Sequence, residues 1–537
     1  MLMALFFVSV FLFFPNESQA STKPSWYPQK SCRSTWNGRD RTKFDPSLDR
    51  NYEAYKLRLK REKIDRRACH KDWTILVYMA ADNDLSPYAL WDLAEMEGRF
   101  AGKTRAGSTL NSDLVVQVYT DDLSGVRRLH MFLRDDRPYR SPQSKAEFAG
   151  LDLNSIASPV VSMEPETVPH SKPSHTERLH TFLEWALREY PSENTMVILW
   201  GHGQGWTAYP SGPTTIPGRL LSETDIPDIV HALPQPGIRK TFGGVLFLPQ
   251  TGERLTIPDL RDIFSDVVTR TLEGNPIDLY VSDACLMQMA EVATELAPFT
   301  RYISGSAQVQ SYLGLPYRRL MYEINSGRYL GTGRLTGGRD RALLVAEMLP
   351  SLAERSFNPT KGDQGKADPE AHKNFTMSSL YSAGLVTEFS DSLSAFSMAM
   401  IEYLNEDQFR ALDVALVMRS APSFMGGGKD LGAFLGLLRI LLDKERLQKG
   451  ASQSSERLYL QIDRLIDSID ASTVARAYGE SYLSASTPFY LLGYRAFGIW
   501  IPSNAQEFRE RSADFAQSSL HAKSHWLDWV RLVLTHR

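Results

Sequence analysis

From Trp73 onward, the chain alternates short apolar runs with segments in which apolar residues recur every three or four positions. Such runs are typical of strands buried on both faces, and the segments between them are typical of helices that cover a sheet. The predicted strands are Trp73–Ala81, Asp113–Thr120, Thr195–Trp200, Ile277–Val281 and Arg301–Gly305. Strands that alternate with helices predict an α/β fold, with a mostly parallel sheet and helices on both faces.

The connections between these strands carry signals of their own. The segment Asp84–Pro87 predicts a helix start, with Pro87 at or near the first turn. Thr176–Tyr190 has the spacing of an amphipathic helix. Val126–Leu133 is expected to form a hairpin with the second strand, and Pro159–Pro173 has the composition of a loop. Residues 72–355 are therefore predicted to form one α/β domain.

Beyond residue 355 the pattern becomes mainly helical. The polar segment Asn358–Asn374 is typical of a linker or an exposed loop. The predicted helices are Ser390–Leu404, Gln408–Val417, Leu431–Lys444, Glu456–Ile469 and Ser524–Leu534. We expect residues 356–537 to form a helical extension, with a late strand at 497–502 as a candidate to complete the sheet of the first domain.

The first twenty residues have the form of a secretory signal peptide. Leu2–Phe14 is almost wholly apolar, Pro15 ends the run, and Ser18–Ala20 offers a cleavage site between small residues. The run is short for a membrane span, with an uncleaved anchor as the alternative. We therefore expect an exported protein, periplasmic or extracellular, with no stable membrane insertion after the signal is cleaved.

Residues 21–71 are strongly basic, with fifteen Lys and Arg against six Asp and Glu, whereas the whole chain has a net charge of −3. A basic leader on an acidic body indicates a pro-segment or clamp held partly by charge. A solvated helical tail is the alternative. The overall charge favours no nucleic-acid partner, and we expect none.

The three cysteines fall into two classes. Cys32 and Cys69 lie together in the leader, and export would permit a disulfide between them. Cys285 is the odd thiol, placed where the fourth predicted strand passes into a helical pattern. An unpaired thiol in an exported protein is a candidate for reactivity, with an inert buried cysteine as the alternative.

His202 and Cys285 each follow a predicted strand, and the carboxyl ends of neighbouring parallel strands meet at one edge of a sheet. A helix N-terminus favours the thiolate, and an imidazole can take the thiol proton and later protonate a leaving amine. The N–H groups of Gly203 and Cys285 are candidate donors to an oxyanion. These residues indicate nucleophilic catalysis, although a Gly-His-Gly turn beside a structural cysteine would have the same spacing.

Local spacing in the sequence does not predict other kinds of site. The glycines of Gly201–Gly205 do not match GxGxxG or GxxxxGK[ST], so a phosphate loop is not predicted. Clusters with zinc-ligand spacing are absent from the sequence, and so is the G-x-S-x-G element of serine hydrolases.

Several motifs, in order along the chain, resemble the clostripain family of cysteine peptidases. They are WTILVYMAADNDL (73–85), ILWGHGQGW (198–206), LTIPDLRDIF (255–264) and, most specifically, IDLYVSDACLMQMAEVATELAPFTRYISGSA (277–307). The resemblance implies a caspase-like, doubly wound sheet. It also implies an endopeptidase that acts on polypeptides, with Cys285 as nucleophile, His202 as general base and acid, no required third residue and no cofactor needed for the chemistry.

The resemblance further implies synthesis as a zymogen. In family members, cleavage between the His and Cys motifs can accompany activation, and residues 207–243 fit this description, with Arg219, Arg239 and Lys240 as possible cut sites. A catalytically silent family member that acts as a binding or scaffold module is the alternative. An unrelated ligand-binding α/β protein is disfavoured by the extent of the match.

Specificity and calcium are two further implications. The family usually prefers Arg or Lys before the scissile bond, and Asp283 matches an acid near that pocket, with a structural helix cap as the alternative. The segment 306–312, which usually carries acids, has Gln308 and Gln310 instead, and Gln308 is expected to contact substrate without supplying charge. Calcium dependence occurs in the family; candidate ligands, with solvated caps as the alternative, are Asp82, Asp84, Asp121 and Asp122.

Overall fold

The computed structural model describes most of the chain between residues 71 and 535. The described residues are 71–98, 106–109, 111–120, 126–131, 156, 158, 160–164, 174–206, 215–216, 219–220, 243–246, 254–329, 340–360, 362, 371–424, 428–483 and 493–535. The predicted signal peptide, the leader up to residue 70 and the predicted Cys32–Cys69 disulfide lie outside these residues.

The described residues form a central sheet of nine strands in the order β14-β12-β11-β10-β5-β1-β2-β3-β4. The five middle strands, from β11 to β2, are parallel, and the two at each end are antiparallel to their neighbours. The predicted mostly parallel sheet is therefore confirmed. The strands are β1 Lys71–Ala81, β2 Ser112–Thr120, β3 Val126–His130, β4 Val160–Glu164, β5 Ser192–Trp200, β10 Ile277–Asp283, β11 Thr300–Gly305, β12 Thr376–Tyr381 and β14 Thr473–Tyr478.

The environment of strand β1 explains why residues 73–81 are almost all apolar. Leu76 and Tyr78 point into one hydrophobic core, whereas Ile75, Val77 and Met79 point into another. Because both faces of the strand are covered, every position from Trp73 to Ala81 except Thr74 is apolar, and each of these residues is buried.

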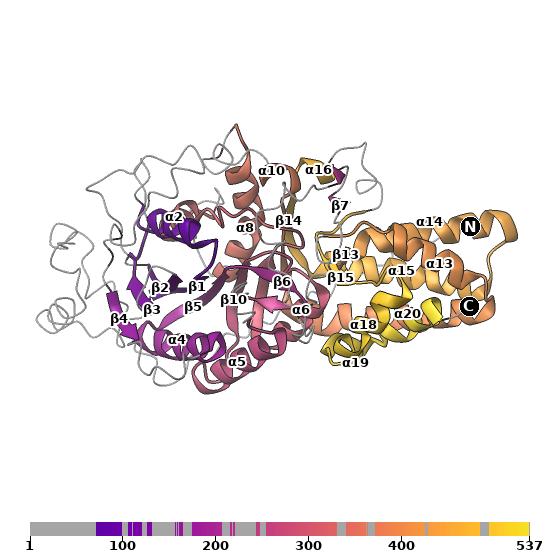
Figure 1. The fold of residues 1–537 in the computed structure, drawn as a ribbon, viewed down its shortest axis with the longest axis horizontal. Coiled ribbons are helices and arrows are strands. Elements are labelled where there is room, and N and C mark those ends of the chain that lie inside the picture. The colour runs from indigo at the N-terminus through magenta and orange to yellow at the C-terminus, as the bar shows by residue number, and fades with distance from the viewer. Residues whose placement is uncertain are drawn as a thin grey trace, which may run out of the picture.

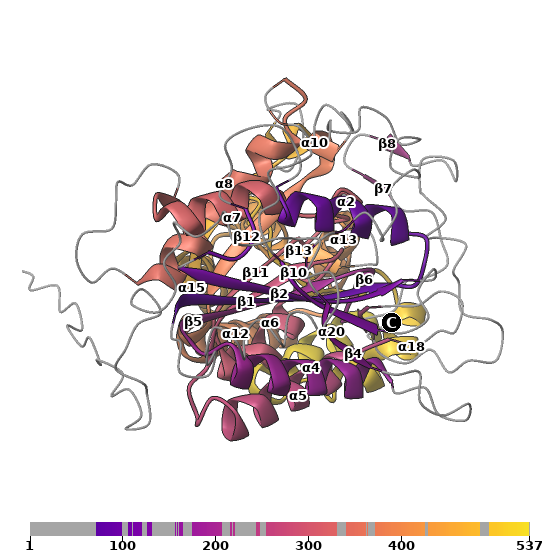
Figure 2. The same cartoon turned by 90° about the vertical axis from the view of Figure 1, so that its left-hand side faces the viewer.

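Helices cover both faces of the sheet, as Figure 2 shows. On one face lie α4 (His175–Glu189), α5 (Ile257–Arg270) and α6 (Ala290–Leu296), followed by the short η5 (Ala297–Phe299). On the other face lie α2 (Ser86–Met96), α7 (Tyr317–Ser326) and α8 (Arg341–Phe357). The predicted doubly wound arrangement is confirmed.

A bundle of helices from the C-terminal part of the chain lies at one end of the molecule (Figure 1). Its aromatic residues Phe396, Phe434, Trp526 and Trp529 pack against one another. They belong to the same core as α4, α5 and α6, so the bundle continues the domain. The helices are α12 Ser390–Glu406, α13 Arg410–Ser420, α14 Leu431–Lys449, α15 Gln453–Ser472, α18 Ala505–Phe515, α19 Ser519–Ser524 and α20 Trp526–Thr535.

Shorter elements connect these layers. The short strands are β6 Gly203–Gly205, β7 Thr215–Ile216, β8 Arg219–Leu220, β9 Gly244–Val245, β13 Gly428–Asp430 and β15 Gly498–Trp500. The short helices are α10 Ala371–Asn374, α11 Ser382–Gly384, η7 Leu385–Phe389 and α16 Glu480–Leu483. In the described part of the chain, every helix is too short or too polar to cross a bilayer.

Four expectations from the sequence are wrong. The late strand at 497–502 becomes β15, which pairs with β13 rather than with the central sheet, whereas β12 and β14 extend that sheet. The sheet therefore crosses the expected boundary at residue 355. The loop expected over 159–173 contains β4, and Lys71, assigned to the leader, begins β1, with its ammonium 2.6 Å from a carboxylate oxygen of Asp113.

Candidate active site

His202 and Cys285 lie at the same edge of the sheet because they follow neighbouring parallel strands. Asp283, at the end of β10, pairs with Trp200, at the end of β5. The backbone N–H of Gly201 continues this pairing by donating to the carbonyl of Asp283 at 3.3 Å. His202 and Cys285 each stand two residues beyond the Trp200–Asp283 pair, as the sequence predicted.

The backbone after His202 packs directly on the backbone of Cys285. A Cβ atom at Gly203 would lie 2.2 Å from the carbonyl oxygen of Cys285 and 3.0 Å from its nitrogen, which excludes any side chain at position 203. The N–H groups of Gly203 and Cys285 therefore belong to two touching peptide segments. Their role as oxyanion donors stays a prediction.

The Cys285 thiol faces the segment that follows β11. Its sulfur accepts a hydrogen bond from the backbone N–H of Gln310 at 3.3 Å. The pKa of the Cys285 thiol is raised to about 11, mainly by burial and in part by the nearby charge of Asp283, although the hydrogen bond from the Gln310 N–H acts to lower it. The resting thiol is therefore protonated at neutral pH and needs a base to become a nucleophile.

The expected helix directly after Cys285 is wrong. Helix α6 begins at Ala290, and Leu286 and Gln288 instead donate their backbone N–H groups to the carbonyls of Gln308 at 3.2 Å and Ser306 at 3.0 Å. The strand-like partner after β11 satisfies these donors before the helix starts. A helix dipole consequently does not act on the thiol, in agreement with its raised pKa.

The imidazole of His202 is buried and bound to Asp84. Its Nε2 lies 2.7 Å from Oδ1 of Asp84, which is 39% exposed and follows β1, the other neighbour of β5. Because a carboxylate only accepts hydrogen bonds, this contact assigns a proton to Nε2, and in the neutral ring Nδ1 is then the nitrogen with the lone pair. Sequence reasoning listed Asp84 as a calcium ligand or cap; its place after a strand adjacent to β5 was the signal for this different role.

Asp283 is buried and anchors the segment 310–317. Its Oδ1 accepts from the Gln310 side-chain amide at 2.6 Å, and its Oδ2 accepts from the Leu315 N–H at 3.0 Å and the Tyr317 hydroxyl at 2.7 Å. Burial raises the pKa of Asp283 to about 6. The alternative interpretation of Asp283 as a helix cap is wrong because α6 begins seven residues later.

Gln308 is only 1% exposed and supports one wall of the site. Its side-chain amide donates to the hydroxyl of Tyr482 at 3.3 Å, and Tyr482 stacks on Tyr494 with ring centroids 4.6 Å apart. These tyrosines belong to a small core with Leu286, next to the cysteine. Substrate contact by Gln308 stays a prediction. In the structure its amide holds Tyr482, which packs near the cysteine.

Asp92, which sequence reasoning missed, is buried beside Asp283. The indole N–H of Trp200 donates to Oδ2 of Asp92 at 2.6 Å, and a Cβ atom at Gly314 would lie 2.5 Å from that oxygen and 3.1 Å from Oδ2 of Asp283. Burial, with the charge of Asp283, raises the pKa of Asp92 well above its ordinary value. In the sequence Asp92 is an ordinary polar position of helix α2, so no pattern marked it.

The calcium and cleavage predictions are only partly within the described residues. Among those residues, Asp82 and Asp84 do not join a third acid or histidine within ligating distance, and Asp121 and Asp122 are outside them. Calcium binding at this edge stays a prediction. Of the possible cut sites, Arg219 lies in β8, and Arg239 and Lys240 are outside the described residues.

Comparison with known proteins identifies the region that holds both residues. Residues 77–216 and 248–336 match the model of the clostripain family. A search of curated proteins gives no significant match. The first matched segment contains His202 and the second contains Cys285, so the match includes both residues at the sheet edge described above.

Solved structures of C11 proteases are similar to the chain at low identity. A secreted C11 cysteine protease from Bacteroides thetaiotaomicron, in complex with an irreversible peptide inhibitor, is 18% identical over 85% of this chain and 99% of its own, with a TM-score of 0.48. An inactive zymogen C11 protease from Parabacteroides distasonis is 16% identical over 85% of this chain and 98% of its own, with a TM-score of 0.47. At these TM-scores the family model, rather than the structures, supports the assignment.

Proposed function

Because residues 77–216 and 248–336 match the model of the clostripain family, we propose that the chain is a cysteine endopeptidase that hydrolyses peptide bonds through Cys285 and His202. The single observation that carries the proposal is the position of these residues after adjacent parallel strands, with the Gly203 backbone packed on that of Cys285. A partly buried thiol and a buried imidazole at the carboxyl ends of adjacent parallel strands are suited to acyl transfer.

The first step is transfer of the thiol proton. Since Nε2 of His202 holds its proton toward Asp84, Nδ1 is the nitrogen with a lone pair for the Cys285 proton. The imidazolium that forms is stabilised by the Asp84 carboxylate, so Asp84 is a positioning residue in this proposal. This route does not need a thiolate in the resting enzyme, which agrees with the raised pKa of the thiol.

The bond changes then follow those of a thioester mechanism. The sulfur of Cys285 attacks the scissile carbonyl carbon, and the N–H groups of Gly203 and Cys285 are proposed to stabilise the oxyanion. His202 gives its proton to the leaving amine, which leaves a thioester on Cys285. His202 then takes a proton from water, and the resulting attack releases the second product and restores the thiol.

Activation and specificity are further parts of the proposal. We propose export by the N-terminal signal and activation by cleavage between residues 207 and 243, both of which rest on the sequence. Asp283 already accepts three hydrogen bonds, one of them from Gln310, and segment 306–312 supplies no acid. A substrate cation would have to displace the Gln310 amide, so preference for Arg or Lys before the scissile bond should be weak.

A fluorogenic peptide panel that varies the residue before the scissile bond tests the activity. We expect cleavage under reducing conditions by the chain that has been cut between residues 207 and 243, much less by the intact chain, and none by Cys285→Ala in either form. The silent-module alternative predicts no turnover by either protein. Labelling by an acyloxymethyl ketone peptide separates the two: a reactive site labels Cys285, and His202→Ala abolishes the label, whereas a silent module is unlabelled in all forms.

A further inference from the structure

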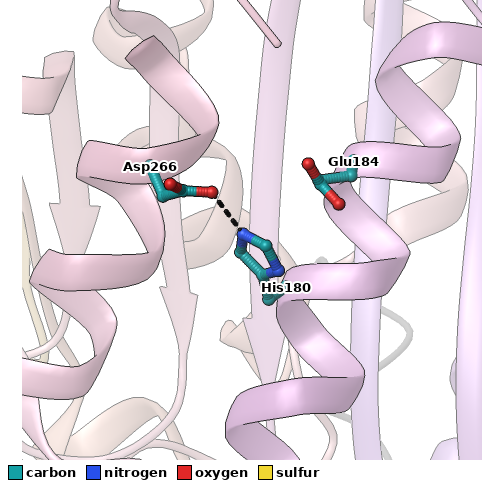
Figure 3. A group of neighbouring side chains, drawn as sticks. All are labelled: His180, Glu184 and Asp266. Carbon is teal, nitrogen blue, oxygen red and sulfur yellow. Dashed lines mark hydrogen bonds and ion pairs between the residues drawn. The ribbon is translucent and has the colours of Figure 1, made fainter. Parts of the chain in front are cut away.

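A group of three potential metal ligands lies between α4 and α5, on the face of the sheet that α4, α5 and α6 cover. His180 and Glu184 stand one turn apart on α4, and Asp266 projects from α5 (Figure 3). One ligand atom from each residue lies within 4.8 Å of the others, and all three residues are partly buried. In the sequence Asp266 is far from the other two, so their convergence is a product of the fold.

The group is held in place by hydrogen bonds that leave ligand atoms facing one another. Nε2 of His180 lies 2.7 Å from Oδ2 of Asp266, as Figure 3 shows. Arg270 binds the other oxygen of Asp266 at 2.8 Å, and Arg188 binds one oxygen of Glu184 at 3.3 Å. Partners of this kind orient metal-binding carboxylates in known sites.

The two arginines do not block access to the group. Their side chains are 69% exposed for Arg270 and 58% exposed for Arg188, and each pairs with an acid one turn away on its own helix. Exposed pairs with this spacing contribute little stability, so their rearrangement around a cation costs little. The His180–Asp266 hydrogen bond would exchange its proton for the metal, as metal binding to imidazole normally does.

We propose that His180, Glu184 and Asp266 bind a divalent transition-metal ion, with Zn²⁺ as the representative. One imidazole nitrogen and two carboxylate oxygens suit zinc, with water in the remaining position. Calcium and magnesium prefer sites made of oxygen alone, so the imidazole favours a transition metal. This site is separate from the calcium ligands expected near the dyad.

The position of the site gives the ion a structural role. Helix α4 leads directly into β5 and His202, whereas α5 leads into β10 and Cys285. The ion would therefore tie together the two helices that support the catalytic strands. In the sequence, α4 precedes residues 207–243 and α5 follows them. If the chain is cut in that segment, the ion would therefore join the two pieces.

Zinc titration of the full chain tests the site without any measurement of peptidase activity. The dyad itself offers zinc a thiol and an imidazole, so every protein in the test carries Cys285→Ala. Metal-stripped protein is titrated with Zn²⁺ by calorimetry, and its thermal unfolding is followed with and without Zn²⁺. The compared variants are His180→Ala and Glu184→Gln, with His525→Ala as the matched control.

The control removes another histidine paired with an aspartate, since Nδ1 of His525 lies 3.2 Å from Oδ2 of Asp528. We expect zinc affinity to fall about tenfold or more in His180→Ala and Glu184→Gln, and to stay unchanged in His525→Ala. Zinc should also raise the unfolding temperature of the parent and of the control, but not that of the two site variants.

Equal zinc affinity in the parent and the site variants would overturn the proposal, as would an equal loss in His525→Ala. If His180→Ala does not fold, Glu184→Gln decides the result, because it keeps the His180–Asp266 pair and removes one charged ligand. Since the measurement needs no catalysis, a failure here leaves the proposed peptidase activity untouched, and a failure of that activity leaves this site testable.

Discussion

Two regions of the molecule contain a histidine bound through Nε2 to an aspartate at the same distance, 2.7 Å. At the sheet edge, His202 is 5% exposed, and the backbone of the next residue packs on Cys285, the proposed nucleophile. Between α4 and α5, His180 is 30% exposed and the neighbouring group is the carboxylate of Glu184. The hydrogen bond alone therefore does not define the chemistry; the third group and the depth of burial do.

Replacement of His202 is expected to give the largest effect. Without the imidazole, the Cys285 thiol with its raised pKa has no base, so kcat/KM of His202→Ala should fall by about 1,000-fold or more. Steady-state kinetics on the best peptide of the panel measures this. A variant that folds normally and keeps more than a tenth of the activity would contradict the assigned role.

Replacement of Asp84 is expected to give an intermediate effect. Asp84→Asn keeps the shape but removes the charge that orients and stabilises the imidazolium, so kcat should fall about 10- to 100-fold with little change in KM. The pH profile of kcat should also shift, which a merely structural role would not cause. Unchanged kcat and an unchanged profile would show that His202 works without this partner.

The pKa of Asp283 tests the deeper burial of the sheet edge, compared with the partly buried pair His180 and Asp266. Its pKa is about 6 in the folded chain and about 3.9 in an unfolded one, so the folded state binds more protons between these values. Stability therefore falls as pH rises from about 4 to 6. Asp283→Asn should remove this part of the pH dependence. The unfolding free energy of the variant minus that of the parent should therefore rise by about 1–3 kcal/mol as the pH increases from about 4 to 6.

Denaturant unfolding of both proteins at pH 4 and pH 7.5 measures the change. Each protein is compared with itself at the two pH values. This is necessary because loss of a carboxylate that accepts three hydrogen bonds lowers the stability of the variant at both pH values. Parallel pH curves for the two proteins would mean that Asp283 does not carry a raised pKa.

His180→Ala should have the smallest effect on catalysis. In metal-free buffer it removes a partly exposed hydrogen bond between α4 and α5, so unfolding free energy should change by about 0.5 kcal/mol or less and kcat/KM by less than about twofold. Activity assays beside His202→Ala make the comparison direct. A large loss of activity in metal-free buffer would mean that the two histidines are not as distinct as their surroundings indicate.

The sequence predicted the strands, and the position of His202 and Cys285 at one edge of the sheet, because both leave local signals. A strand buried on both faces, such as β1, must be apolar throughout, and residues after parallel strands share an edge. His202 and Cys285 were found by these rules. The partner of His202 was not, because which acid of the segment Asp82–Asp84 faces the imidazole depends on the turn after β1 and not on sequence spacing.

Long-range pairing explains the other errors. Strands β12 and β14 join the sheet although helices surround them in sequence, and β15, a stronger apolar pattern, pairs elsewhere. The helix expected at Cys285 starts at Ala290 because the segment after β11 binds the intervening backbone. The group of His180 and Asp266 likewise requires two helices to pack side by side, which no local pattern records.

The salt bridge at the start of β1 has a mechanical consequence. Nζ of Lys71 is bound to Asp113, and strand β1 itself is hydrogen-bonded along its length to parallel neighbours on both sides, β2 and β5. A force that pulls on the chain before Lys71 would load these hydrogen bonds in shear, all at once, rather than opening them one at a time. Tension on the preceding segment, as a protease or a translocation machine would apply, is therefore shared along the whole strand. The residues that follow the strand, such as Asp84, are then shielded from it.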